Sequence, residues 1–329
     1  MTPEELKTKI SSVVSSPYST QVYLVLKQDD NLQLKLADIE RDSDTEREST
    51  ETEITSLFSG YIKSLIVDKE DLVLCELSTA DERNDAIYHY DYEEYPEELG
   101  LFLNFDIESA IKGDKFDFSQ DDLSKLYGYI IYLGSMESGI VLFKKHYPVS
   151  LIKRDSFLLG AIKSKNRFEK IAGEDIIRLN GTAQLIRVEG EIFVTDLTVL
   201  ERNFGFNKLI FKAAEDTIQA IEQLALIEDI QVLKDAAEES TFARKLSKVK
   251  KSSPIIKLNI PKEVIIEFTK NTNELAGKFK YSEDGNTIRL DTKKSKEAFL
   301  KLMNDAFLRS ELTKQYYEVL AKDNITQVS

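Results

Sequence analysis

The sequence contains very few of the residues that form disulfide bonds and transition-metal sites, with one cysteine and two histidines among 329 residues. A single cysteine, Cys75, excludes a disulfide within the chain. Its apolar neighbours predict a buried thiol in a strand, as expected for a protein of the reducing cytoplasm. One thiol and two imidazoles are also too few for a structural zinc site of the Cys/His type. Zinc chemistry is therefore not expected.

Glycine-rich motifs are missing as well. The 13 glycines are scattered singly, so the sequence has neither a Walker loop nor a dinucleotide-binding fingerprint. It also has no Gly-x-Ser-x-Gly motif, which removes the commonest signal of a serine hydrolase. We therefore expect no cofactor, and the chain is not predicted to be an enzyme.

The best candidate for catalysis is the segment Tyr88–Glu94. If this segment is a strand, its tyrosines lie on one face and His89, Asp91 and Glu93 lie on the other. Such a polar face could hold Mg²⁺ or Mn²⁺ in a nuclease. A half-buried strand with its aromatic face in the core and its polar face in water explains the same pattern, and we favour that structural interpretation.

Long apolar runs are also absent. The longest uncharged apolar stretch, Leu126–Met136, is much shorter than the ~20 residues of a membrane-spanning helix. The first residues, Met1–Glu5, are acidic where a signal peptide would be basic and then apolar. We expect a cytoplasmic protein that does not span the membrane.

Acidic charge is in excess, but it is unevenly distributed. The chain has 44 Lys and Arg against 58 Asp and Glu, a formal net charge of −14. Residues 1–137 contain 12 basic and 31 acidic residues, whereas residues 138–329 contain 32 basic and 27 acidic residues. The second part is therefore net positive, as in regions that meet nucleic acid or another anion. Ordinary solvated surfaces would give the same totals.

The pattern of apolar residues predicts an α+β fold. Thr2 is a helix cap, followed by Pro3 and by apolar residues at helical spacing as far as about Ser16. Alternating patterns typical of antiparallel strands follow. They occupy residues 21–27, 32–36, 126–133, 139–146, 175–179, 183–188 and 191–196, the last three as a meander.

Two domains are predicted. Residues 1–205 form an antiparallel β-rich α+β domain, and residues 206–329 form a helix-rich domain with a short hairpin near residues 278–291. Residues 38–53 contain eight acids and one large apolar residue, Ile39, so we expect an acidic loop there.

Two basic clusters are the most informative functional signal, because Lys and Arg that release counterions from phosphates supply most nucleic-acid affinity. We predict DNA contacts in the first cluster from Lys144, Lys145, Lys153, Arg154, Lys163, Lys165, Arg167 and Lys170. The second cluster comprises Arg244, Lys245, Lys248, Lys250 and Lys251. On a helix, Arg244, Lys248 and Lys251 would form a basic stripe. Such clusters also occur as solvated faces, and they could equally meet the acidic half of a second subunit or lipid headgroups.

Four sequence strings resemble the KwaB family of bacterial Kiwa anti-phage systems, and the similarity spans most of the chain. They are Tyr88–Asp91, Leu142–Pro148, Leu200–Phe206 and Leu302–Thr313. The resemblance implies a cytoplasmic defence effector that binds DNA and works with a small membrane-embedded partner, KwaA, which senses infection. It also implies a homodimer that docks on this partner at the inner face of the cell membrane.

The basic clusters suggest a function that needs no bond chemistry. Lysines without an aromatic ladder or a recognition helix favour phosphate contacts, so DNA binding should be largely independent of sequence. Bound phage DNA would be blocked in replication or expression. A metal-dependent nuclease and a non-DNA-binding adaptor of the membrane partner are the alternatives.

Overall fold

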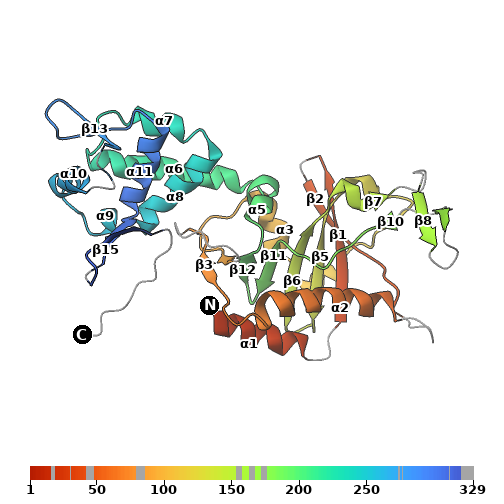
Figure 1. The fold of residues 1–329 in the computed structure, drawn as a ribbon. Helices are drawn as coiled ribbons and strands as arrows, with labels where there is room; N and C mark the ends of the chain where they lie inside the picture. The colour runs from red at the N-terminus through yellow and green to blue at the C-terminus, as the bar shows by residue number, and fades with distance from the viewer. Residues whose placement is uncertain are drawn as a thin grey trace. The chain divides into compact units, whose positions relative to one another are not determined.

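A computed structural model describes most of the chain, and it divides into two compact units (Figure 1). The first unit comprises residues 1–72 and 98–199, and the second comprises residues 73–97 and 200–329. The described residues are 1–15, 19–29, 31–41, 48–78, 86–152, 158–162, 167–171, 176–272, 275, 277–310 and 312–319.

The first unit is built on an antiparallel sheet with strand order β2-β1-β5-β6-β11-β12. These strands are β1 (Ser19–Gln28), β2 (Asn31–Leu36), β5 (Leu126–Gly134), β6 (Gly139–Lys145), β11 (Leu185–Val188) and β12 (Glu191–Val194). Two helices, α1 (Pro3–Val14) and α2 (Thr50–Ile62), lie along one face of this sheet (Figure 1). The unit also contains a π-helical turn (Lys63–Val67), α3 (Gly100–Leu103), α4 (Ile107–Ala110), β7 (Leu151–Ile152), β8 (Leu158–Ile162), β9 (Arg167–Ile171) and β10 (Ile176–Ile177).

The predicted start of the chain is confirmed. Thr2 and Glu5 form a reciprocal capping box, which satisfies two backbone N–H groups at the start of α1. The helix ends at Val14 and buries its apolar face. The predicted hairpin is also present, since β1 and β2 pair in antiparallel register.

The expected acidic loop at residues 38–53 is wrong in its last part, because α2 begins at Thr50. Ser49 is the helix cap, and its hydroxyl accepts the backbone N–H of Thr52 at 3.2 Å. Glu51 and Glu53 then lie in the first turn, where the helix dipole favours negative charge. Acids that indicated a loop by composition therefore stabilise a helix start. Residues 42–47 lie outside the described residues.

The predicted meander of residues 175–196 is correct only for its second and third strands. β11 pairs with β6 on one side and with β12 on the other, so both of its edges are occupied. β10 therefore pairs with β7 instead. The turn at Glu189-Gly190 joins β11 to β12, as the sequence indicates.

The second unit is rich in helices, which confirms the α+β assignment with a helical C-terminal part. It contains α5 (Leu197–Asn203, at its boundary), α6 (Phe206–Gln223), α7 (Gln231–Ala236), α8 (Ser240–Ser252), α9 (Pro254–Lys257), α10 (Lys262–Asn271) and α11 (Lys293–Met303). Its strands are β3 (Leu74–Glu76), β4 (Ile87–His89), β13 (Lys280–Tyr281), β14 (Ile288–Arg289), β15 (Phe307–Arg309) and β16 (Tyr316–Glu318). β13 and β14 form the hairpin predicted near residues 278–291.

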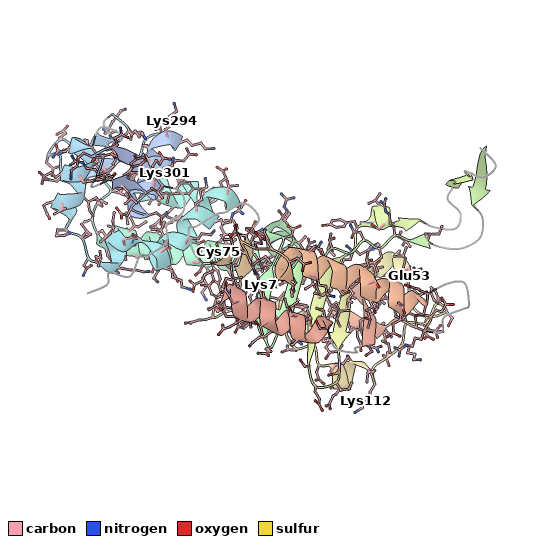
Figure 2. All side chains as sticks on the ribbon, turned by 60° about the horizontal axis from the view of Figure 1, so that its bottom comes forward. Lys7, Glu53, Cys75, Lys112, Lys294 and Lys301 are labelled. Atoms are coloured by element: carbon pink, nitrogen blue, oxygen red, sulfur yellow. The ribbon has the colours of Figure 1, made fainter. Side chains whose placement is uncertain are left out.

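Residues 73–97 reach this unit from the N-terminal half of the sequence. Here β3 and β4 pair in parallel. Cys75, labelled in Figure 2, lies on β3 and is buried, as predicted. The segment Tyr88–Glu94, considered above as a possible strand, is not one throughout, because β4 ends at His89. Tyr88 and Tyr90 are buried, which confirms the predicted aromatic side of this segment.

Candidate nucleic-acid interface

The first basic cluster is only partly described. Arg167 and Lys170 lie on β9, where they pair in register with Ile162 and Leu159 of β8. The predicted contacts that fall outside the described residues are Lys153, Arg154, Lys163 and Lys165. The side-chain geometry of this cluster is therefore described for Lys144 and Lys145, the last two residues of β6.

Lys144 is buried, with 6% of its surface exposed. Its Nζ donates to Asn180 Oδ1, to the Thr182 carbonyl at 3.0 Å and to Thr182 Oγ1 at 3.1 Å. All three acceptors are neutral, and burial lowers the pKa of Lys144 to about 8. The ammonium is inaccessible to a phosphate in this conformation, so its role as a direct DNA contact is not supported. Lys144 instead ties β6 to the chain that precedes β11.

Lys145 points toward an aromatic ring on the neighbouring strand. Its Nζ lies 3.3 Å from the centroid of Tyr127 on β5, and Lys27 Nζ from β1 lies 5.8 Å from the same centroid. Three adjacent strands therefore bring Lys27, Tyr127 and Lys145 together, and we call these residues the Tyr127 cluster. Lys27 is exposed, whereas Tyr127 and Lys145 are half-buried.

The Tyr127 cluster has no counter-charge among the described residues. No carboxylate there forms an ion pair with Lys27, Lys144 or Lys145. Burial, and then the charge of Lys27, lower the pKa of Lys145 to about 8. The ring attracts each cation, but the two cations repel one another. An anion bound here would offset the repulsion between the Lys27 and Lys145 ammonium groups. It would also stabilise the charged form of Lys145, which burial disfavours.

His146 lies behind the Tyr127 cluster and is buried. Its Nδ1 lies 3.0 Å from Tyr129 Oη. Burial and the charge of Lys145 lower the pKa of His146, so the ring is neutral at pH 7. His146 therefore adds no charge to the cluster.

The second basic cluster lies on α8, but its predicted stripe is wrong at Lys248. This residue is 4% exposed, together with Leu246 and Val249, which are fully buried. Because α8 packs against both α6 and α11, the buried part of its surface extends beyond its apolar residues and includes Lys248. A direct contact from Lys248 to DNA is therefore not supported in this conformation.

The other cations of α8 mostly face acids of the same unit. Arg244 Nη1 lies 3.3 Å from Glu201 Oε1, and Lys250 Nζ lies 3.9 Å from Asp216 Oδ2. Lys251 forms an ion pair with Asp91. Lys245 is exposed. In contrast to the Tyr127 cluster, the α8 surface is largely neutralised within its own unit.

The candidate metal face at residues 88–94 does not form as one strand face, because β4 ends before Asp91. Asp91 instead accepts the backbone N–H of Ser78 at 2.8 Å, the Ser78 hydroxyl and the Lys251 ammonium. Among the described residues, no group of three His, Cys, Asp or Glu side chains is arranged to hold a metal ion. Asp91 thus has a structural role in this conformation.

Sequence reasoning missed Lys27 and Tyr127. Lys27 stands alone in the sequence, near the acidic turn that follows β1. The predicted hairpin of residues 126–133 and 139–146 held one usable signal, since its register places Tyr127 opposite His146 and so beside Lys145. Pairing with β1 was not predictable from the spacing.

None of the helices in the parts of the chain that the structure describes is long and apolar enough to span a bilayer. No solved structure matches the chain. A family model described as Kiwa protein KwaB-like matches residues 123–313. The Kiwa protein KwaB of Escherichia coli O55:H7 (strain RM12579 / EPEC) is 28% identical over 329 residues, which cover 99% of this chain and 100% of that relative. The chain therefore belongs to the KwaB-like family and is a component of a Kiwa anti-phage defence system.

Proposed function

We propose that this chain is a defence effector that binds DNA through phosphate contacts, largely independently of sequence. The observation that carries the proposal is the Tyr127 cluster, in which Lys27 and Lys145 converge on one ring without a carboxylate partner among the described residues. By contrast, Arg244, Lys250 and Lys251 of α8 each face a carboxylate of their own unit. Cations that converge without an acid favour an external anion.

The geometry of the Tyr127 cluster suits a phosphate backbone. The ring holds the Lys145 ammonium in place, so less side-chain entropy is lost when a phosphate binds. A phosphate also raises the pKa of Lys145 by stabilising its charged form. Neither lysine has the planar, bidentate geometry that reads a base edge, which supports binding independent of sequence.

The acidity of the first 137 residues supports a restraint on this binding. The acidic residues repel the DNA phosphates, so DNA can approach only at a basic face. This repulsion limits binding to the host chromosome in the absence of phage. We propose that the protein holds phage DNA and blocks its replication or expression, without cutting it.

The family relationship supports a membrane-embedded partner, KwaA, and a homodimer of this chain docked on it. Recruitment to the inner face of the cell membrane would place the Tyr127 cluster near incoming phage DNA. Co-purification of both proteins from membranes, with this chain alone as the control, tests the partnership.

An equilibrium titration of DNA at several salt concentrations, with and without Mg²⁺ or Mn²⁺, tests the proposed function. A phosphate-binding effector shows log K falling with log[salt] at roughly −0.9 per phosphate contact, and the DNA remains intact. Metal-dependent cleavage would indicate the nuclease alternative instead. No binding at any salt concentration would indicate the adaptor.

A further inference from the structure

A short acidic segment of the second unit lies on two of its helices. Tyr90 and Tyr92 pack edge-on against Phe206 at the start of α6, with ring centroids 5.7 and 5.1 Å away. The same segment directs acids at cations of these helices. Asp91 pairs with Lys251 of α8, and Glu94 Oε1 lies 2.5 Å from Lys212 Nζ of α6.

Asp91 is held in position independently of α8. It accepts hydrogen bonds from the Ser78 backbone N–H and from the Ser78 hydroxyl, and its side chain is only 10% exposed. Lys251, by contrast, is 53% exposed. The Asp91 carboxylate is therefore held in place by Ser78 and faces the more exposed Lys251. Asp91 thus acts as a preorganised acceptor for this cation.

The remaining ion pairs of α8 extend the same pattern. Glu201 faces Arg244 and Asp216 faces Lys250, so three cations of one helix meet carboxylates of the same unit. A carboxylate and a phosphate oxygen offer the same kind of charged acceptor to these donors. The carboxylates thus occupy positions beside the α8 cations that the phosphates of a bound nucleic acid could take.

We propose that α8 carries a second phosphate-binding surface, which the chain's own carboxylates occupy in the absence of nucleic acid. This inference rests on the proposed DNA binding. Asp91 and Glu201 act as internal competitors, and DNA engages Lys251 and Arg244 by displacing them. The side chains of Lys251 and Arg244 are 53% and 31% exposed, so a dense polyanion can reach both cations from solvent and compete with the carboxylates. The chain's own carboxylates therefore weaken DNA binding by this surface but do not prevent it.

Charge-removing substitutions of the internal competitors test this inference. Asp91→Asn retains an oxygen that can accept from Ser78 but removes the charge facing Lys251. Glu201→Gln frees Arg244 without touching Ser78, and therefore tests the inference if Asp91→Asn fails to fold. Glu93→Gln is the matched control, since it removes the same charge from an exposed residue of the same segment that forms no ion pair with α8 among the described residues.

The measurement is the affinity of the full chain for a short DNA duplex at about 150 mM salt, followed by the salt dependence. Asp91→Asn and Glu201→Gln should each bind about tenfold more tightly, with a salt slope steeper by about 0.9 for each cation released. Adding Lys251→Gln to Asp91→Asn should cancel the gain in DNA affinity.

An equal gain in DNA affinity in Glu93→Gln would reveal a general charge effect and overturn the inference. Wild-type binding with no gain in either variant also overturns it, whereas absence of all binding refutes the proposed function itself.

Discussion

Lys145 Nζ lies 3.3 Å from the centre of the Tyr127 ring, and it has no carboxylate partner among the described residues. A cation held against an aromatic face is stabilised by roughly 0.5–2 kcal/mol, depending on its desolvation. Burial and the nearby charge of Lys27 act against this contact, and they lower the pKa of Lys145 to about 8. The site is therefore arranged to gain from a bound anion.

DNA affinity should fall when the pH rises from 7 to 9. Lys145 and Lys144, with pKa values of about 8, are mostly charged at pH 7 and mostly neutral at pH 9. Loss of the Lys145 charge removes a phosphate contact, and we expect affinity to fall about tenfold, or about 1.4 kcal/mol. Fluorescence anisotropy at constant ionic strength measures this dependence.

Lys145→Arg provides the control for this pH dependence. Arginine remains charged throughout this range, so the fall in affinity between pH 7 and 9 should become much smaller. An unchanged pH profile in Lys145→Arg would assign the dependence to another group.

The free energy of unfolding should rise between pH 8 and 10. Lys144 and Lys145 titrate near 8 in the folded chain but near 10.5 when unfolded, so the unfolded state binds more protons in this window. Above pH 10 the trend should reverse, because burial raises the pKa of Tyr92 to about 12. Urea unfolding of wild type and of a Lys144→Gln, Lys145→Gln variant measures this, and equal slopes in both would refute the assignment.

Ser49→Ala should destabilise the first unit by about 1 kcal/mol, because it removes the cap of α2. Ser56→Ala, at an exposed position inside the same helix, should be neutral or slightly stabilising. Urea denaturation compares the two variants. If residues 50–53 formed a loop, Ser49→Ala would have no larger effect than Ser56→Ala.

Local signals in the sequence predicted most secondary structure correctly. Thr2, Pro3 and Glu5 indicate the start of α1 through bonds within one turn. Strand alternation around Asp29 predicts the first hairpin for the same reason. Composition alone failed at Glu51 and Glu53, since acids favour both a loop and the first turn of a helix, and only the Ser49 cap distinguishes them.

The candidate site was less accessible to sequence reasoning, because its charge balance depends on contacts between distant residues. Lys27 and Lys145 are 118 positions apart, and β1, β5 and β6 must pair before the two lysines meet at Tyr127. Likewise, Asp91 neutralises Lys251 from 160 positions away. Residue counts along the chain therefore predicted a basic stripe on this helix, although three of its cations, Arg244, Lys250 and Lys251, face acids.

The central claim is that the Tyr127 cluster binds DNA phosphates, and the salt dependence of a Lys27→Gln, Lys145→Gln variant tests it most directly. The matched control is Lys35→Gln in the same sheet, where Lys35 already pairs with Asp114 and Asp121 at 3.5 and 3.6 Å. The account predicts that the double variant binds more weakly and that its plot of log K against log[salt] is shallower by about 1.8, while Lys35→Gln resembles wild type. Equal slopes for wild type and the double variant would contradict the account.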